Sequence, residues 1–517
     1  MNFNLASPFY LSACKYADRL AISADGQELT YAECLEQVVR VAEWLRAGTK
    51  LPRRVGILAS RSADCCIATL AAAWIGAAYV PINLSMPEQG KLRVMNRANL
   101  DALIADSAGS SMLTQGLLDA APDRVLARTA LIPERSSKSI SDFEELKPAA
   151  GPAEPALVDG AATGYIMFTS GSTGVPKGVV ISCGAVDHFL RVMAADYSLT
   201  PEDRVAGTFA ATFDLSVHNL FATMYAGASL HIVPDGALLS PTKLIQSHEI
   251  TCWFSVPSLV ELMDRMNLLK PGIFPTVRQS LFCGEPLLSK VASAWQASAP
   301  ASSVTNMYGP TEATVMCLKE DFRQGCATTR DCVAIGLPFP GMKASVLKPE
   351  MTWAADGEDG ELLLSGPQLA DGYLDDPEKT RNSFIIIGDE RWYRTGDLAH
   401  RDSNGIFHYL GRIDNQVKVL GYRVELEEIE FHLREITGCK SVAAIAWPLN
   451  GTSASGIAAF LAGFQGAVPE IKAAMQQRLP FYMVPSQFRQ LAELPTNSNG
   501  KVDRRALRDL LDRRVSA

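Results

Sequence analysis

The chain has 517 residues, of which 47% are apolar and 20% charged, and its formal net charge at pH 7 is −8. This length predicts two to four domains, and the composition is that of an ordinary soluble protein with enough apolar residues for large cores. The acidic balance, without any run of Lys or Arg, argues against nucleic acid as the main partner.

Cysteine spacing and hydropathy indicate the cellular compartment of the protein. Its eleven cysteines form no CxxC pair and do not cluster with the seven histidines, which indicates reduced thiols in a cytoplasmic protein and no zinc site. The N-terminus lacks the basic and apolar regions of a signal peptide. Residues 65–87 are uncharged over a length that could cross a membrane, but Gly76, Pro81 and Asn83 divide them into a buried helix and a strand. We therefore expect no membrane insertion.

The first 160 residues alternate short apolar strands with helices. Strands are expected at 55–59, at the segment ending at Pro81, and at 103–105, with helices between them. This alternation predicts a mostly parallel sheet with helices on both faces. Residues 136–160 are polar and rich in Pro and Ala, and are expected to connect to the next strand.

The stretch at 164–178 reads GYIMFTSGSTGVPKG, and residues 165–168 predict a strand. Residues 169–174 then offer four hydroxyl side chains and two glycines, followed by Lys177. Glycines let the backbone approach an anion, hydroxyls donate to phosphate oxygens, and lysine adds a charge. The hypothesis is a phosphate-binding loop, with a flexible Gly/Ser connector as the alternative. A Walker A loop is excluded because Gly178 follows Lys177 where that loop has Ser or Thr.

Further strands and helices follow in alternation. Strands are expected at 179–182, 229–233 and 252–255, and helices at 185–197, 241–248 and 259–269. Beyond Gly336, short strands separated by Gly, Pro and Asp turns predict a smaller β-rich subdomain. Residues 425–435 have helical spacing, with acidic residues early in the helix.

Ten motifs occur in one order between residues 29 and 504: LTYAEC, AWIGAAYVPIN, GYIMFTSGSTGVPKG, FDLSVHN, NMYGPTE, GELLLSGPQLADGYL, YRTGDL, GRIDNQVKVLGYRVELEEIE, LPFYMVP and NGKVDR. Together they resemble the core motifs of the amino-acid adenylation domains of nonribosomal peptide synthesis. Those domains belong to the adenylate-forming superfamily of acyl-CoA synthetases and luciferases. The strings FDLSV, FCGE and YGPTEATV are especially similar to D-alanine–carrier protein ligases, which are free-standing.

The resemblance implies an α/β fold with a large N-terminal domain at 1–410, made of layered αβ sheets and a β-rich subdomain. A hinge at 411–414, containing Asp414, would lead to a small mobile α+β domain at 415–517. It also implies two half-reactions. A small amino acid would be activated with ATP and Mg²⁺ as aminoacyl-AMP, and the phosphopantetheine thiol of a carrier protein would then displace AMP. Thirteen residues follow Arg504, so the carrier is expected on a separate chain.

Catalytic roles are implied for Lys501, which would bridge the substrate carboxylate and the α-phosphate, for Thr169, and for Glu312 as the magnesium ligand. Tyr308 would stack on adenine, Asn306 would read its amino edge, and Asp397 would bind the ribose diol. Thr311 would contact the α-phosphate, and Arg412 would add a ribose or phosphate contact. The full ATP set is Thr169, Ser170, Gly171, Ser172, Thr173, Gly174, Lys177, Gly284, Glu285, Asn306, Met307, Tyr308, Gly309, Thr311, Asp397, Tyr409, Arg412 and Lys501.

Asp214 matches the acid that pairs with the substrate α-ammonium. The implied pocket comprises Phe213, Asp214, Leu215, His218, Ser255, Leu281, Cys283, Met307, Val315 and Met316, with Lys501 at its mouth. His218 and the methionines fill volume, so a small substrate is expected: D-alanine or a similar amino acid, or a small L-amino acid such as Pro, Cys, Ser or Val. His218, Met307 and Met316 depart from the D-alanine ligases, which leaves side chain and enantiomer open. An acyl- or aryl-CoA ligase and a nucleotide-binding protein without catalysis are the alternatives.

Overall fold

The computed structural model describes residues 2–24, 26–48, 50–133, 139–148, 154–171, 176–234, 236, 238, 240–323, 325–439, 441–450, 453–496 and 502–515. The chain divides into two compact units. The first comprises Met1–Leu84, Val94–Phe168 and Gly178–Gly411. The second comprises Ser85–Arg93, Thr169–Lys177 and Arg412–Ala517. The glycine-rich loop therefore groups with the C-terminal residues, although the strands on either side of it are mainly in the first unit.

The first unit contains two large sheets, which are mostly parallel as expected. Within the described residues, the nine-stranded sheet runs, in spatial order, through β18 (Leu337–Pro338), β15 (Leu318–Phe322), β14 (Ser303–Tyr308), β13 (Gln279–Phe282), β12 (Cys252–Ser255), β10 (Arg204–Gly207), β11 (Ser229–Ile232), β1 (Leu20–Ala24) and β2 (Gln27–Thr30). The eight-stranded sheet runs through β21 (Gly372–Tyr373), β9 (Lys177–Ser182), β8 (Thr163–Thr169), β4 (Ala78–Ile82), β3 (Arg54–Leu58), β5 (Ala102–Ala105), β6 (Val125–Ala127) and β7 (Ile140–Asp142).

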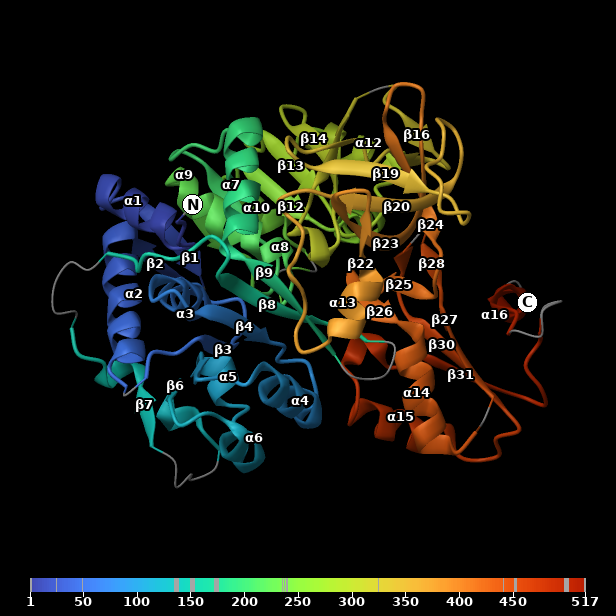
Figure 1. Ribbon diagram of the computed structural model, residues 1–517, viewed down its shortest axis with the longest axis horizontal. Coiled ribbons are helices and arrows are strands. Elements are labelled where there is room, and N and C mark those ends of the chain that lie inside the picture. Colours follow the sequence, from blue (N-terminus) through green and yellow to red (C-terminus); the bar gives the residue numbers. More distant parts are fainter. Residues whose placement is uncertain are drawn as a thin grey trace. The chain divides into compact units, whose positions relative to one another are not determined.

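Helices and short helical turns connect these strands (Figure 1). They are α1 (Ser7–Lys15), α2 (Tyr31–Arg46), α3 (Ala63–Trp74), α4 (Glu88–Ala98), α5 (Ser107–Ser110), α6 (Gln115–Ala120), η1 (Thr129–Leu131), η2 (Phe143–Glu145), α7 (Cys183–Tyr197), α8 (Leu215–Val217), η3 (His218–Ala222), α9 (Thr223–Ala226), α10 (Thr242–Ser247), α11 (Pro257–Arg265), α12 (Ser289–Ser298) and η5 (Thr311–Ala313). The segment η3 is a π-helix, which the sequence pattern did not predict.

Local sequence explains where the first helices begin. The Thr30 hydroxyl accepts a hydrogen bond from the Glu33 amide, and the Glu33 carboxylate accepts one from the Thr30 amide, which forms a capping box for α2. Ser62 caps α3 with a single bond, in which its hydroxyl accepts from the Cys65 amide. The uncharged stretch is confirmed as the buried helix α3 followed by the buried strand β4. Among the described residues, no helix combines the length and the apolar character needed to cross a membrane.

The predicted β-rich subdomain is also present in the first unit. Its five-stranded sheet, as far as the structure describes it, contains β19 (Lys343–Leu347), β20 (Gly360–Ser365), β23 (Glu390–Arg401), β22 (Phe384–Ile387) and β24 (Phe407–Arg412). Helix α13 (Pro377–Ser383) precedes β22, and β16 (Thr328–Thr329) pairs with β17 (Cys332–Val333).

The second unit is an α+β fold with its own apolar core. Its described sheets contain β26 (Tyr422–Glu425), β25 (Gln416–Val419), β29 (Ser453–Ala454) and β28 (Leu449–Asn450), and then β27 (Val442–Ala446), β30 (Ile457–Ala462) and β31 (Gln487–Leu491). The helical segments are α14 (Leu426–Thr437), α15 (Val468–Gln476), η6 (Phe481–Met483) and α16 (Arg504–Val515). Helices α14 and α15 lie side by side (Figure 1). Helix α14 begins and ends within two residues of the predicted helix.

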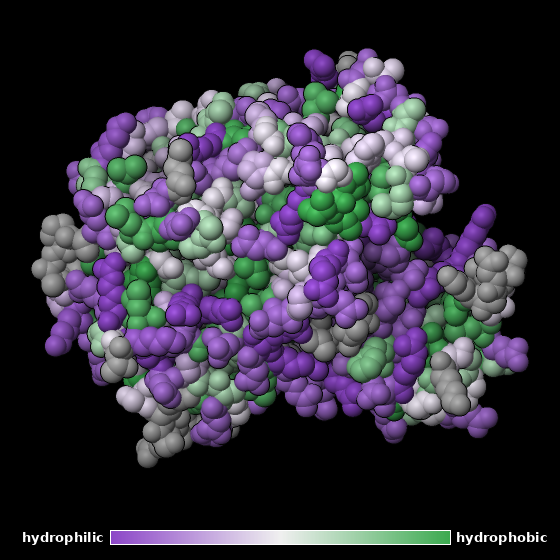
Figure 2. All heavy atoms as spheres, viewed as in Figure 1, coloured by the Kyte–Doolittle hydropathy of each residue, from purple (hydrophilic) through white to green (hydrophobic). Residues whose placement is uncertain are grey.

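On the face shown in Figure 2, hydrophilic residues surround small, separate apolar patches. No disulfide joins any of the eleven cysteines, all of which lie among the described residues, and eight of them are buried.

A charged cluster joins the starts of three parallel strands of the nine-stranded sheet. The Asp203 carboxylate, 3% exposed, accepts hydrogen bonds from Thr251 Oγ1 at 2.7 Å, from Arg278 Nε at 2.7 Å and from Arg278 Nη2. These residues immediately precede β10, β12 and β13. Burial alone would raise the pKa of Asp203, but the bonds from Arg278, Thr200 and Thr251 outweigh it and lower the pKa to about 2.

We predict that Asp203→Asn lowers the free energy of unfolding at pH 7 by about 2 kcal/mol. A carboxyl group whose pKa is lower in the folded state stabilises the fold above its unfolded pKa of about 4, and this contribution is lost as the pH falls toward 2. Urea titrations should therefore show the wild type and variant converging over that pH range. Glu202→Gln, in an exposed ion pair with Arg19, is the control and should change stability by less than about 0.5 kcal/mol. A difference that persists undiminished at low pH would contradict the assignment.

Candidate functional site

The carboxyl ends of β12, β13 and β14 meet at one edge of the nine-stranded sheet. Ser255 lies opposite Phe282, and Phe282 lies opposite Asn306, so three predicted motifs leave the sheet together. Residues that follow parallel strands at this edge are commonly those that bind ligands. The register therefore brings the Ser255, Cys283–Glu285 and Met307–Tyr308 positions into one neighbourhood.

The predicted pocket residues on these strands are buried. Ser255, Leu281, Cys283, Met307 and Met316 are all at most 2% exposed. Ser255 Oγ accepts a hydrogen bond from Trp253 Nε1 at 2.9 Å and donates to the Val256 carbonyl at 3.1 Å. These residues lie in the interior of the first unit.

The chain after β14 makes a tight turn. A Cβ atom at Gly309 would lie 2.4 Å from Met316 Cα, so only glycine fits there. Thr314 and Val315 have positive φ angles of 54° and 72°, a conformation that is costly for β-branched residues. Gln368 Nε2 donates to the carbonyls of Ala313, Thr314 and Met316 and so holds the turn in place. The position of Val315, a predicted pocket residue, is therefore fixed by a strained backbone that Gln368 stabilises.

Glu312 lies within this turn, in η5, together with Thr311. It is fully buried, and its Oε1 accepts a hydrogen bond from the Tyr373 hydroxyl at 2.8 Å. The Ala370 amide also donates to the Glu312 carbonyl at 2.8 Å. A carboxylate is the type of ligand that Mg²⁺ prefers.

Two residues predicted to bind the nucleoside contact each other directly. The Tyr308 hydroxyl donates a hydrogen bond to Asp397 Oδ2, and Asp397, in β23, is 7% exposed. Asn306 Nδ2 donates to the carbonyls of Val333 at 3.2 Å and Ala334 at 2.8 Å, which fixes the orientation of the amide. Tyr409 lies in β24 and packs against the main core.

The FDLS motif places Asp214 at the start of α8, with Phe213 before it near Phe209. Gly284, with φ +89°, packs under Leu215, because a Cβ atom there would lie 3.6 Å from Leu215 Cδ1. Helix α8 therefore contacts the same strand end as the residues above. Burial raises the pKa of Tyr165, and the neighbouring Tyr79 and Asp214 raise it further, so the Asp214 carboxylate lies within electrostatic range of the tyrosine.

Glu285 and His218 are both buried polar residues. Glu285 Oε2 accepts a hydrogen bond from the Ser258 amide at 3.0 Å, near the start of α11. His218 is 3% exposed, and its ring lies edge-on to Phe254, with ring centroids 4.9 Å apart. Burial lowers the pKa of His218 to about 3, so its imidazole is neutral at physiological pH.

The glycine-rich loop contacts acidic residues of the second unit. Lys177 Nζ donates to Glu425 Oε1 at 2.9 Å, and the Gly171 amide donates to Glu428 Oε2 at 3.3 Å. Ser170 Oγ donates to the Arg423 carbonyl at 2.9 Å. Burial raises the pKa of Glu428 to about 7, although the Gly171 amide and Arg93 oppose this shift.

Thr169 Oγ1 is buried, and no described residue hydrogen-bonds to it. This orphaned hydroxyl fits the predicted contact with a phosphate oxygen. Four predicted residues lie outside the described residues: Ser172, Thr173, Gly174 and Lys501.

Arg412 and Asp414 form a bidentate ion pair at the start of the C-terminal part of the second unit. Arg412 Nε lies 2.9 Å from Asp414 Oδ1, and Nη2 lies 2.6 Å from Oδ2. Burial favours the neutral form of Asp414, but the bonds from Arg412 and the Gln416 amide lower its pKa. The Arg412 guanidinium, which the sequence predicts to contact the nucleotide, is therefore paired with Asp414, the predicted hinge residue.

Four residues that support these positions had no role in the sequence analysis: Gln368, Tyr373, Glu425 and Glu428. All four lie within quoted motifs, GPQLADGYL and GYRVELEEIE, so the motifs were the available signal. Their partners are 52 to 61 residues away for Gln368 and Tyr373, and 248 to 257 residues away for Glu425 and Glu428. Pairing over such distances is visible only in the folded chain.

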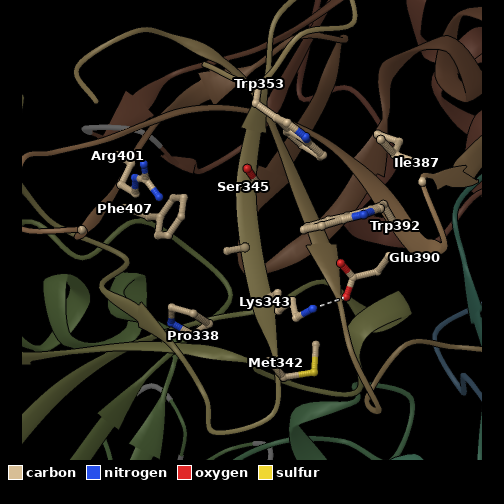
Figure 3. Close-up of a pocket in the computed structure, with 13 residues that line it drawn as sticks. Pro338, Met342, Lys343, Ser345, Trp353, Ile387, Glu390, Trp392, Arg401 and Phe407 are labelled. Atoms are coloured by element: carbon tan, nitrogen blue, oxygen red, sulfur yellow. Dashed lines mark ion pairs between the residues drawn. The ribbon is translucent and has the colours of Figure 1, made fainter. Parts of the chain in front are cut away.

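Two hollows in the described part of the chain are lined by residues that do not belong to the predicted nucleotide or substrate sites. A surface hollow of about 660 Å³ on the β-rich subdomain is bordered by Trp353, Trp392 and a Lys343–Glu390 ion pair of 2.7 Å (Figure 3). A cavity of about 50 Å³ is lined by Ser216 and Asn219, which neighbour the predicted residues of the same helical segment. Neither hollow corresponds to the predicted substrate pocket.

The chain is similar to known proteins over most of its length. The sequence profile of the family described as AMP-binding enzyme matches residues 9–374. The D-alanine–D-alanyl carrier protein ligase of Bacillus cytotoxicus is 30% identical, covering 96% of this chain and 97% of that protein. The delta-poly-L-ornithine synthetase of Acinetobacter baumannii is 32% identical over 98% of this chain, which spans only 36% of that longer protein.

A solved structure shares nearly the whole fold. The Vibrio cholerae adenylation domain AlmE, crystallised with glycyl-adenosine-5'-phosphate, superimposes with a TM-score of 0.88 at 30% identity, covering 99% of this chain and 98% of that one. The mixed α/β fold expected from the sequence is therefore confirmed.

We predict that Tyr308→Phe weakens AMP binding roughly 5- to 20-fold, because it keeps the ring but removes the donor that holds the Asp397 carboxylate. Isothermal titration calorimetry with AMP would measure this change. Tyr31→Phe is the matched control, since it also removes a buried tyrosine hydroxyl, here one that donates to the Ala228 carbonyl at 2.7 Å. Unchanged AMP affinity in Tyr308→Phe would show that the contact does not serve a nucleotide.

Proposed function

Since this chain belongs to the AMP-binding enzyme family, we propose that it uses ATP to activate a small amino acid as an aminoacyl adenylate and transfers the aminoacyl group to the phosphopantetheine thiol of a carrier protein. The observation that supports this most directly is the packing of Leu215 over Gly284. This packing brings the helix that begins after Asp214 against the end of β13, and the neighbouring strand β14 ends at Tyr308. It supports a common neighbourhood for an ammonium anchor and nucleotide contacts.

The nucleotide would be held by residues at the edge of the nine-stranded sheet. Tyr308 would stack on adenine, Asn306 would face its amino group, and Asp397 would accept hydrogen bonds from the ribose hydroxyls. Thr311 would contact the α-phosphate. Glu312 would hold Mg²⁺, which would neutralise phosphate charge when bound; the buried carboxylate and its Tyr373 donor fit this role.

The glycine-rich loop would bind the phosphates. Its support is that Gly171 and Lys177 already donate to two carboxylates, and that Thr169 Oγ1 is buried without a described partner. Groups that donate to carboxylates also suit phosphate oxygens. When ATP binds, its anionic oxygens would replace the carboxylates of Glu425 and Glu428 as the acceptors of these donors.

Two displacements would make up the reaction. In the first, an oxygen of the amino-acid carboxylate forms a bond to the α-phosphorus of ATP, and the bond to the pyrophosphate oxygen breaks. In the second, the carrier thiol gives up its proton and forms a bond to the acyl carbon, and AMP leaves with the electron pair of the anhydride bond. Lys501 would place its charge between the carboxylate and the α-phosphate in the first step, and rotation at Asp414 would separate the two steps.

The substrate class rests on the pocket residues and on two relatives. His218, Met307 and Met316 are large buried side chains, which favours a small amino acid. A D-alanine ligase and an adenylation domain bound to a glycyl adenylate are among the similar proteins. D-Alanine or another small amino acid is therefore the proposed substrate class.

We expect Asp214→Asn to lower kcat/KM for amino-acid-dependent ATP–pyrophosphate exchange roughly 10²- to 10³-fold, because a charge pair at ~3–4 Å contributes on the order of 4–5 kcal/mol gross at an effective dielectric near 20. Asp264→Asn, which changes an exposed carboxylate of α11, should leave exchange unchanged. Equal rates of pyrophosphate exchange in the wild type and in Asp214→Asn would reject the role of Asp214 as the partner of the substrate α-ammonium. Exchange driven equally well by propionate, which lacks the amine, would indicate an acyl ligase.

For Lys501→Ala, the expected loss is roughly 10²- to 10³-fold in adenylation rate, comparable to the loss of other preorganised electrostatic groups. The far-ultraviolet circular dichroism spectrum should stay unchanged, since the substitution removes one side chain from a terminal motif. Lys472→Ala, an exposed position of α15, controls for loss of a lysine in the same unit. Near-normal pyrophosphate exchange would reject the catalytic assignment.

A further inference from the structure

His218 is a buried polar side chain without a hydrogen-bond partner among the described residues. Both ring nitrogens have almost no exposed surface, and no described residue donates to or accepts from either one. Of the seven histidines, only His432 shares this property; the other five each have a polar partner. A neutral imidazole offers one donor and one acceptor, and burying such groups unpaired costs about 1–3 kcal/mol.

The position of His218 relates it to the proposed substrate anchor. It follows Asp214 by four residues at the end of α8, and residues four apart lie on one side of a helix. His218 also begins the π-helix η3, and π turns within helices are frequent at functional sites. The imidazole is thus one turn away from the proposed partner of the substrate α-ammonium.

The neighbours of His218 do not satisfy its nitrogens. Its ring lies against Phe254, at 4.9 Å, and Phe189, at 6.4 Å between centroids. These rings fix the imidazole in position but provide no conventional acceptor or donor. A fixed polar group enclosed by aromatic residues is suited to a ligand that brings its own hydrogen-bonding group.

Other polar residues of the proposed pocket wall are less suited to this role. The Ser255 hydroxyl already accepts from Trp253 and donates to the Val256 carbonyl. The Cys283 side chain is a thiol, which is a weak donor and a weak acceptor. His218 is therefore the strong hydrogen-bonding group that this wall offers to a substrate side chain.

We infer that His218 determines specificity by hydrogen-bonding the substrate side chain, and that the preferred substrate is a small amino acid with a side-chain hydroxyl group. The inference rests on the proposed function, because it assigns a role within the amino-acid pocket. A hydroxyl group suits a neutral imidazole in either tautomer, because it can donate to the unprotonated ring nitrogen or accept from the protonated one, whichever faces it. An alanine side chain would leave both nitrogens unpaired.

The test compares serine with 2-aminobutyrate, in which a methyl group replaces the hydroxyl at the same size. ATP–pyrophosphate exchange is measured for both enantiomers of each, together with glycine, alanine, cysteine and threonine. We expect the wild type to favour serine over 2-aminobutyrate of the same hand by roughly 10- to 100-fold in kcat/KM, since the methyl analogue leaves the imidazole unpaired. A ratio near one, or a preference for 2-aminobutyrate or alanine, overturns the inference.

Variants separate recognition from general damage to the pocket. His218→Leu should bring the serine to 2-aminobutyrate ratio to one or below, and His218→Gln, which keeps a donor and an acceptor, should retain part of the preference. His432→Leu is the matched control: it also replaces a buried histidine without a described partner, and it should leave the ratio unchanged. An equal loss with both substrates in His218→Leu would overturn the inference. If that variant does not fold, the wild-type ratio and His218→Gln decide the question.

Failure of the inference and failure of the proposed function give different results. Strong exchange with glycine or alanine, without any preference for serine over 2-aminobutyrate, would reject the role of His218 and leave amino-acid adenylation standing. No exchange with any amino acid of either hand would reject the proposed function itself.

Discussion

Parallel hydrogen bonding between β12, β13 and β14 aligns Ser255 with Phe282 and Phe282 with Asn306. Every residue that leaves these strands therefore enters the same space, and the neighbourhood of the candidate site depends on this register. A shift of one residue would turn Leu281 and Met307 to the opposite face of the sheet. The Asp203 cluster, at the other end of the same strands, ties together the segments that precede β10, β12 and β13. The charged Asp203 cluster therefore stabilises one end of these strands, and the candidate site residues lie at the other end.

Backbone strain and buried polar groups both occur among the residues of the proposed pocket. Thr314 and Val315 adopt positive φ angles, and the three donor contacts of Gln368 compensate for the cost. Glu312 is buried beside Tyr373, and His218 is buried beside phenylalanine rings. If stability were the only requirement, apolar side chains of similar size would serve as well as charged or polar ones at these buried positions.

In the second unit, donors of the glycine-rich loop contact protein carboxylates. Lys177 and the Gly171 amide contact the carboxylates of Glu425 and Glu428, although the loop composition suits phosphate. Carboxylate and phosphate oxygens are both acceptors of charge-assisted hydrogen bonds, so a loop rich in donors does not by itself distinguish them. Glycines and hydroxyls in the sequence predicted a phosphate-binding loop, which stays a prediction, and they could not predict that Gly171 and Lys177 contact protein carboxylates.

Much of this protein was determined by local sequence. Strand–helix alternation indicated the parallel sheets, glycine and proline turns indicated the β-rich subdomain, and capping residues set the starts of α2 and α3, because these features depend on neighbours within a few residues. Motif order indicated the family and the candidate residues. Tertiary structure alone decided that Gln368 supports the turn at 313–316, that Tyr308 contacts Asp397, that Arg412 pairs with Asp414, and that His218 has no partner among the described residues. Such facts depend on which side chains meet after folding, and on which buried groups are left without a partner, and neither follows from spacing along the chain.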